Sequence, residues 1–329
     1  MPPSSLKNRT IKISADSPAA STLLIFQAVF PFLLFAGNDK GEAVSLEIEG
    51  GTNVSWSLSY EYLDQVLLPA LEEAFGIVVE RKLHQRGWSL GKASRGKVEF
   101  RFVPLKVGEG LKLREGYGKN GGGSEEVEEV DVSMIVPADM HESLMQALAT
   151  DLEELFPGVE VNFKVVEDST ADSRIYVLLV AKSGSGARWG RDILSSMPKK
   201  VAKAKGKGGA QTTSSLSQTI SRRVSKELYE EVSTGGVVDE FLQDQLVIFQ
   251  ALAEGRTSFL RSEDEGGGLE IDGKGMRKEK TDKPFGEGST HTTTARWVTA
   301  QLLPSIGWYN KGKVCEGVGM HMETMGKTR

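Results

Sequence analysis

The sequence predicts an α/β protein in which two related α/β units flank a small inserted α/β domain. Of its 329 residues, 39% are hydrophobic and 26% are charged, values typical of globular proteins that bury a core. Segments with the two-residue period of strands alternate with segments of helical period. One such series ends at a glycine and acid tract, residues 121–129, a second series follows, and the first pattern then partly returns. This order is typical of an α/β fold.

The first unit is predicted to open with a strand near Ile11 and a buried apolar helix. Ser17 and Pro18 indicate the helix start, as a capping hydroxyl followed by proline in the first turn. The apolar run 22–37 is too short to span a bilayer with ease and contains Gln27, so we expect no membrane span. No charged segment with a cleavage site precedes it, which argues against a signal peptide. The elements expected next are a strand at Val44–Glu49, a helix at Tyr60–Phe75 ended by Gly76, and strands at Ile77–Leu83 and Lys97–Val103.

The insert and the last unit are predicted from the same two periodicities. The insert is expected to contain a strand at Val130–Val136, a helix at Glu142–Phe156, and strands at Val159–Val166 and Arg174–Ala181. The last unit is expected to contain helices at Gln218–Val232, Val238–Ala253 and Thr292–Leu303, and strands near Ser258 and at Lys313–Glu316. The predicted division is therefore 1–125 for the first part of the core, 126–215 for the insert with a basic linker, and 216–329 for the last part of the core.

Charge and cysteine content exclude several classes of protein. The formal net charge of −5 argues against broad, nonspecific binding of nucleic acid but leaves room for a local basic pocket that holds one strand end. The basic tract 199–207 lies in a Gly/Ser/Thr-rich stretch that runs to about Ser217. We interpret it as a solvated linker, with an RNA-contacting or nuclear-targeting segment as the alternative. Cys315 is the one cysteine, which excludes a disulfide framework and a cysteine-ligated zinc site and favours a reducing compartment.

Two further patterns are interpreted as structural. Residues 184–190 imitate a phosphate-binding loop but lack its Lys-Ser/Thr ending, so we expect a turn there. His84, His141 and His321 are scattered in the sequence without the spacing of metal ligands, and we expect each to have a structural role.

His291 is the first candidate for a reactive side chain. It lies in a Ser/Thr-rich run, residues 288–297, just ahead of an amphipathic helical stretch. The hydroxyl groups can cap this helix, and its free N–H groups and positive dipole end favour a phosphate and a neutral imidazole. A neutral imidazole at that place can attack phosphorus. The alternative is an ordinary surface histidine near a helix start.

Asp244 is the second candidate. It lies on the helix predicted from Val238, which runs into the nearly all-apolar segment 247–252. A carboxylate buried there without a partner would cost several kcal/mol, so Asp244 either faces solvent or has a partner. Buried carboxylates often mark functional sites, and the alternative is an aspartate that caps a neighbouring loop. Gln27, inside the first apolar helix, raises the same question more weakly.

Several of these segments together resemble the RNA 3′-terminal phosphate cyclase family. The specific ones are EFLQDQL at 240–246 and THT at 290–292 with the helix that follows it. Further matching segments are EGGTN at 49–53, LLP at 67–69, FGI at 75–77, RGW at 86–88, the helix at 21–36 and CEGVGM at 315–320. The resemblance covers most of the chain in the right order. It implies a fold of repeated units, each a four-stranded sheet backed by two helices, plus a small α/β insert.

The resemblance also implies a reaction. The implied enzyme converts an RNA 3′-terminal phosphate into a 2′,3′-cyclic phosphate, with ATP and a divalent metal, Mg or Mn, as cofactors. The histidine matched by His291 would attack the α-phosphate of ATP and become adenylylated. AMP would then pass to the RNA 3′-phosphate, and attack by the neighbouring 2′-hydroxyl would expel AMP and close the ring. Splitting one difficult displacement into such steps is what nucleophilic catalysis achieves.

Roles for four other residues follow from the resemblance. Asp244 and Gln245 would hold the nucleotide and orient the histidine, Phe241 would stack on adenine, and Gln27 would lie near the phosphate. Phe241 stands where relatives often have tyrosine, so the stacking face is kept without the hydroxyl group. The pair Leu58-Ser59 replaces two prolines that form the other wall of the adenine slot. No residue of this chain is assigned as a metal ligand.

The match begins beyond the family's Gly-rich segment with its catalytic glutamate and phosphate-binding arginines, so we expect a truncated or divergent member. One alternative is a non-catalytic, cyclase-like protein of ribosome biogenesis and rRNA processing, a branch that typically lacks the histidine. Another is a small-molecule transferase or a binding module of similar architecture. We expect an RNA 3′ end as partner and a location in the nucleus, in nucleoplasm or nucleolus, and also in the cytoplasm. The sequence leaves the oligomeric state open.

Overall fold

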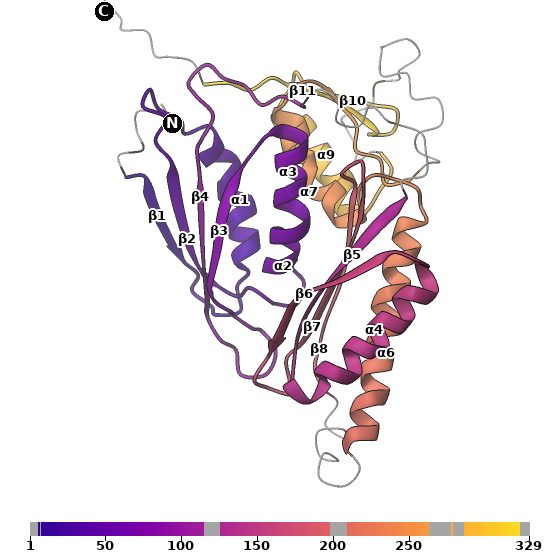
Figure 1. Cartoon of the computed structure of the whole chain (residues 1–329). Coiled ribbons are helices and arrows are strands. Elements are labelled where there is room, and N and C mark those ends of the chain that lie inside the picture. The colour runs from indigo at the N-terminus through magenta and orange to yellow at the C-terminus, as the bar shows by residue number, and fades with distance from the viewer. Residues whose placement is uncertain are drawn as a thin grey trace, which may run out of the picture.

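The computed structural model describes residues 6, 8–114, 126–197, 209–262, 278 and 286–322. Within these ranges the chain forms two four-stranded sheets and one three-stranded sheet, with helices packed against them (Figure 1). The predicted α/β class is confirmed. Figure 1 shows the first sheet and the sheet of the insert converging, with helices of the first and last units between and behind them.

The first unit has the expected four strands and two helical segments. Its strands are β1 (Thr10–Ser14), β2 (Val44–Gly50), β3 (Val79–Gln85) and β4 (Gly96–Phe102), in the order β1-β2-β4-β3. Strand β1 is parallel to β2, and the other pairs are antiparallel. The helical segments are α1 (Thr22–Leu34) and the continuous series α2 (Tyr60–Tyr62), a π-helical turn (Leu63–Leu67) and α3 (Leu68–Phe75). Alternate residues of β2, such as Leu46 and Ile48, are buried with Phe26 and Phe30 of α1.

The ends of these helices follow local chemistry, with one correction. Helix α1 is capped by Ser21, whose Oγ accepts hydrogen bonds from Leu23 N at 3.1 Å and Leu24 N at 3.2 Å. The predicted start at Ser17 is therefore wrong, because the Ser17 hydroxyl instead accepts from Ala19 N in a preceding turn. The predicted end of α3 at Gly76 is confirmed, since this glycine has a left-handed φ of 71°.

The insert is a second four-stranded sheet with the order β6-β5-β7-β8. Its elements are β5 (Val127–Val136), a 3-10 turn (Ala138–Met140), α4 (His141–Leu155), β6 (Glu160–Asp168), β7 (Ile175–Ser183), β8 (Arg188–Ser195) and α6 (Gly209–Val232). One face of this sheet packs on α4 and α6. The opposite face, through Ile135, Tyr176 and Leu178, packs into the core of the first unit. The insert is thus joined to the rest of the chain by a buried interface.

Two segments of the insert differ from the prediction. Of the turn expected at residues 184–190, only the first residues form one, because strand β8 begins at Arg188. Helix α6 begins at Gly209, so the expectation of a linker running to Ser217 is wrong for its last part. Serines replace apolar residues on the buried face of α6, where Ser217 Oγ lies 2.8 Å from Ser143 Oγ of α4. The basic tract 199–207 lies outside the described residues, and the three-part domain division stays a prediction.

The last unit consists of two helices and a small antiparallel sheet. Its elements are α7 (Glu240–Leu252), β9 (Glu254–Thr257), α9 (Thr290–Leu302), β10 (Gly307–Tyr309) and β11 (Val314–Val318). The sheet order is β10-β11-β9, three strands within the described ranges rather than four. Val247 and Ala251 of α7 pack with Ala300 of α9 and with Trp308 and Cys315 of the sheet. Helices α7 and α9 therefore share one small core.

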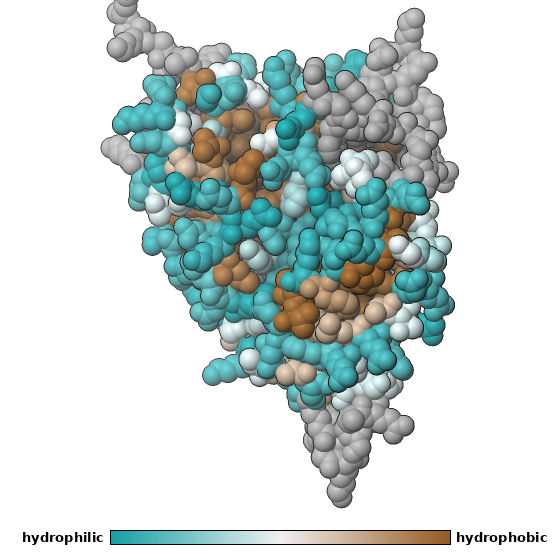
Figure 2. All heavy atoms as spheres, in the orientation of Figure 1, coloured by the Kyte–Doolittle hydropathy of each residue, from teal (hydrophilic) through white to brown (hydrophobic). Residues whose placement is uncertain are grey.

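In the part of the chain that the structure describes, no helix is long and apolar enough to cross a membrane. Helix α1, the most apolar segment, instead buries Phe26 and Phe30 in the core. Figure 2 shows a largely hydrophilic face with a few separate hydrophobic patches.

Candidate functional site

Four of the five predicted site residues come together where α1, α7 and α9 meet. His291 Nδ1 of α9 lies 3.7 Å from Asp244 Oδ2 of α7. Gln245 Nε2 donates a hydrogen bond of 3.4 Å to the same Asp244 oxygen. Gln27 of α1 in turn donates through its Nε2 to Gln245 Oε1. We name Gln27, Asp244, Gln245 and His291 the α7–α9 site.

The start of α9 presents His291 to solvent. Ser289 caps the helix by accepting a hydrogen bond of 3.1 Å from Thr292 N. Gly288 precedes the cap with a φ of 120°, and a Cβ there would lie 2.8 Å from the side chain of Gln243. Thr292 is fully buried, whereas the side chain of His291 is 86% exposed. The first turn contains no acidic residue, so its N–H groups and the imidazole can receive an anion together.

Asp244 is a poorly solvated carboxylate with few polar neighbours. Its side chain is 21% exposed, and burial raises its pKa, while the nearby His291 lowers it. At 3.7 Å the contact with Nδ1 is an ion-pair distance and longer than a hydrogen bond. A carboxylate in this position favours a proton on Nδ1 and leaves the lone pair of Nε2 available. That is the arrangement required of a histidine that acts as a nucleophile.

Phe241 lies one turn earlier on α7, outside this polar group. Its ring is 37% exposed and makes an edge contact with Tyr62 at 6.2 Å between centroids. The guanidinium carbon of Arg191, from strand β8, lies 4.9 Å from the centroid of the Phe241 ring. The arginine covers part of the ring and the rest remains open to a stacking partner. Ser59, which stands where the family resemblance implies a proline of the adenine slot, caps α2 by accepting a hydrogen bond of 3.0 Å from Tyr62 N.

The fixed end of α7 is a feature that the sequence analysis missed. Asp239 caps the helix, and its fully buried carboxylate accepts hydrogen bonds from Phe241 N at 2.8 Å and Leu242 N at 2.9 Å. It also accepts from Gly190 N at 2.7 Å and from the Tyr62 hydroxyl at 2.8 Å. An aspartate directly before a helical pattern is an N-cap signal that could have identified it. Arg191 carried no comparable signal, because strand β8 was not predicted.

The described residues offer no ready metal cage. Among them no three His, Cys, Asp or Glu side chains come close enough to hold a metal ion together. The other three histidines each have polar contacts, and their structural role stays a prediction. His84 Nε2 lies 3.0 Å from Glu99, His141 Nε2 lies 3.1 Å from the carbonyl oxygens of Val136 and Glu167, and His321 Nδ1 lies 3.1 Å from the carbonyl oxygen of Gly319. The α7–α9 site itself presents an imidazole, a carboxylate and two amides.

Comparison with known proteins places the chain in a family. The chain is 30% identical over 241 residues to an RNA 3′-terminal phosphate cyclase of Thermococcus kodakarensis, covering 72% of this chain and 60% of that protein. It is 28% identical over 253 residues to the Pyrococcus abyssi protein of the same name, covering 77% and 65%. The Drosophila melanogaster protein of that name is 25% identical over 260 residues, covering 78% and 64%.

The matched region thus spans about three fifths to two thirds of the length of these relatives. The model of a single family, described as RNA 3′-terminal phosphate cyclase, matches residues 2–305. That range includes all four residues of the α7–α9 site and the whole insert. The chain therefore belongs to the RNA 3′-terminal phosphate cyclase family.

Proposed function

We propose that this chain uses ATP to convert an RNA 3′-terminal phosphate into a 2′,3′-cyclic phosphate, with His291 as the nucleophile. The observation that carries the proposal is the exposed imidazole of His291 at the start of α9, with Asp244 3.7 Å from its Nδ1. Family membership supports the substrate class, because the relatives are named for this reaction.

In the proposed first step, Nε2 of His291 attacks the α-phosphorus of ATP. A nitrogen–phosphorus bond forms, the bond from the α-phosphorus to the bridging oxygen breaks, and pyrophosphate leaves. The free N–H groups at the start of α9 favour the phosphate. Asp244 stabilises the positive charge that develops on the imidazole, and Gln245, held by Gln27, keeps the carboxylate in place. The exposed part of the Phe241 ring offers a stacking face for adenine.

In the later steps, an oxygen of the RNA 3′-phosphate attacks the phosphorus of the histidine-bound AMP and releases the imidazole. The neighbouring 2′-hydroxyl then attacks the RNA 3′-phosphorus, loses its proton and expels AMP, which closes the cyclic phosphate. A divalent cation, when bound, neutralises the departing pyrophosphate. The proposal assigns this cation to the phosphates of ATP, which are oxygen ligands of the kind that Mg²⁺ prefers.

The test is incubation of the full chain with α-labelled ATP and magnesium or manganese, followed by measurement of acid-labile, alkali-stable label on the protein. Wild type is expected to take up label and His291→Ala to take up none. His84→Ala is the matched control, because His84 pairs with Glu99 on the first sheet, and its label should equal that of wild type. Added RNA with a 3′-phosphate should discharge the label and yield a cyclic end.

A folded wild-type chain that takes up no label would contradict the proposal. It would favour the second candidate, a non-catalytic, cyclase-like protein in ribosome biogenesis and rRNA processing. The nuclear location that we propose for the chain is tested separately, by imaging a tagged copy in cells of its source.

A further inference from the structure

A strained and exposed tryptophan lies on the loop between β2 and α2. The side chain of Trp56 is fully exposed, at 101% of its reference area, and its φ is 66°. Among the described residues no other large hydrophobic side chain is as exposed. A positive φ is unfavourable for a bulky residue, and such outliers persist chiefly where they have a function. Neither packing nor backbone preference accounts for Trp56.

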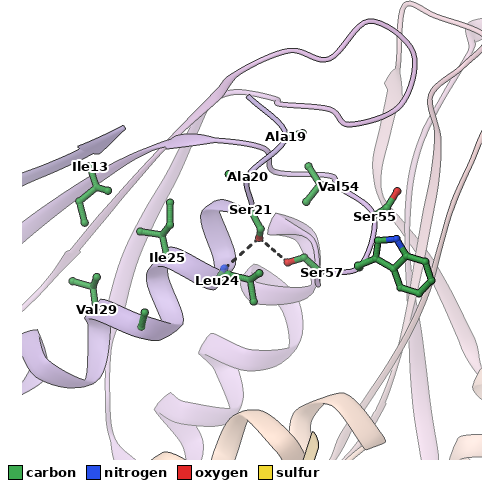
Figure 3. A pocket seen from close by; sticks show the side chains of 12 residues that line it. Ile13, Ala19, Ala20, Ser21, Leu24, Ile25, Val29, Val54, Ser55 and Ser57 are labelled. Atoms are coloured by element: carbon green, nitrogen blue, oxygen red, sulfur yellow. Dashed lines mark hydrogen bonds between the residues drawn. The ribbon is translucent and has the colours of Figure 1, made fainter. Parts of the chain in front are cut away.

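The loop of Trp56 borders a groove of about 570 Å³ beside α1. Ser57 Oγ of this loop lies 2.6 Å from Ser21 Oγ, at the start of the helix (Figure 3). The groove is lined along α1 by Leu24 and Ala28, which flank Gln27 of the α7–α9 site in the helix. A rise of 1.5 Å per residue places Ser21 about 9 Å from Gln27 along the helix axis. The groove therefore leads from Trp56 toward the proposed reactive end.

A neighbouring loop brings positive charge to the same surface. Residues 86–97 include four cations, Arg86, Lys92, Arg95 and Lys97, and no acid, in a chain whose net charge is −5. This loop is joined to the loop of Trp56 by a hydrogen bond of 3.0 Å from Ser55 N to Ser89 Oγ. Arg86 and Lys97 have carboxylate partners. For Lys92 and Arg95 the described residues supply none, and Arg95 donates to Ser14 Oγ and to the Asp16 carbonyl oxygen at 3.3 Å.

We propose that this surface binds the single-stranded RNA that precedes the reacting 3′ end, with Trp56 stacked on a base and Lys92 and Arg95 near the phosphates. This inference rests on the proposed function, which supplies the strand. An isolated aromatic side chain beside hydroxyl groups and cations that have no carboxylate partner among the described residues is the pattern of single-strand binding, in which stacking tolerates any base. A protein partner would call for a broader apolar face without free cations.

The test measures RNA affinity without ATP, by the anisotropy of a labelled oligouridylate that carries a 3′-phosphate. Trp56→Ala is expected to weaken binding about tenfold and Trp56→Phe less than about threefold, as for base–aromatic stacking. Phe32→Ala is the matched control, since Phe32 is an exposed aromatic of α1 outside the groove lining, and it should leave affinity unchanged. Lys92→Ala should reduce the slope of affinity against salt by about one.

Two further measurements separate RNA binding from other roles. RNA should quench the tryptophan fluorescence of wild type more than that of Trp56→Phe, because Trp88, Trp189 and Trp308 are buried and the half-buried Trp297 is present in both proteins. Trp56→Gly should melt at or above the temperature of wild type, since glycine accepts the positive φ, and yet bind RNA about tenfold more weakly.

Three results would overturn the inference. One is RNA binding that Trp56→Ala leaves unchanged, and another is a fall in melting temperature of Trp56→Gly, which would mean a structural role. The third is a change of oligomeric mass in Trp56→Ala, which would mark a protein interface. Because the label assay uses ATP without RNA and this assay uses RNA without ATP, loss of one signal leaves the other readable.

Discussion

Two carboxylates of α7 differ in their surroundings. Asp239 caps the start of the helix, which we call its fixed end, and Asp244 lies on the side that faces His291, which we call its open face. Asp239, at its start, is fully buried and accepts hydrogen bonds from two N–H groups of its own helix, from Gly190 of the insert and from Tyr62 of the first unit. Asp244, in mid-helix, is partly exposed, and among the described residues its polar contacts are with Gln245 and His291. Burial raises the pKa of both groups.

The two carboxylates differ in whether their oxygens can still accept hydrogen bonds from a ligand. Every oxygen of Asp239 is used to join three parts of the chain, so this residue can do little but hold them together. Asp244 bears the cost of desolvation with incomplete compensation, which is the condition expected of a group that meets a ligand. Structural and functional carboxylates can therefore be told apart by their partners even when their pKa values shift in the same direction.

The largest expected effect is the loss of stability when Asp239, at the fixed end of α7, is replaced. Asp239→Ala removes the helix cap and leaves Gly190 N and the Tyr62 hydroxyl without their acceptor, so the free energy of unfolding should fall by about 3 kcal/mol. Asp244→Ala, the matched change on the same helix, should cost less than about 1 kcal/mol. Urea unfolding of both variants measures the two free energies. Equal losses would mean that Asp239 and Asp244 contribute equally to stability.

The next largest effect is expected on the labelling rate, when the charge of Asp244 on the open face is removed. Asp244→Asn keeps the shape of the side chain but removes the charge opposite Nδ1 of His291, so the rate of protein labelling by α-labelled ATP should fall about a hundredfold. Its urea midpoint should match that of wild type. Labelling at the wild-type rate would show that the carboxylate does not assist the histidine.

A smaller effect concerns pH and the fixed end. Asp192, beside Arg191, contacts Tyr176 and lies near Glu61 and Asp239, and desolvation raises its pKa to about 6. The folded carboxyl keeps its proton up to about pH 6, whereas the unfolded one loses it near its ordinary pKa of 3.8. The free energy of unfolding should therefore fall as pH rises from about 4 to about 6, by at most about 1.4 kcal/mol per pH unit. Asp192→Asn should lose this contribution, and the difference between the two pH profiles isolates it.

The smallest effect is expected at Phe241, the aromatic ring beside the open face. Phe241→Tyr restores the hydroxyl group that relatives often carry while keeping the stacking area and the contact with Arg191. The KM for ATP in the labelling reaction should change less than about threefold, because the ring rather than the hydroxyl group supplies the stacking face. Phe241→Ala serves as the comparison and should raise this KM more strongly. A larger effect of the tyrosine than of the alanine would argue against stacking.

Prediction from the sequence succeeded where the periodicity was strong. In strands β2 and β4 every second residue is buried and the residues between them are mostly half-buried, and apolar spacing predicts the helices α4 and α7. Strand β8 was missed because it buries Arg191 through an ion pair with Glu231, so its polarity does not follow the usual alternation. Strand β10 has three residues, too few to show a period. The start of α6 is hidden in the sequence because its first buried residues, Thr213 and Ser217, carry hydroxyl groups, which resemble a linker in composition.

The candidate site divides in the same way. Local sequence is enough to predict a hydroxyl-capped helix with His291 in its first turn and a carboxylate on a nearly apolar helix, since capping and periodicity depend on a few neighbouring residues. The packing of the helices, by contrast, brings Asp244 to His291 and Gln27 to Gln245, 218 residues further along the chain. The insert likewise holds the start of α7 through Gly190. Such contacts arise from the packing of whole elements, for which no local pattern in the chain encodes the partner.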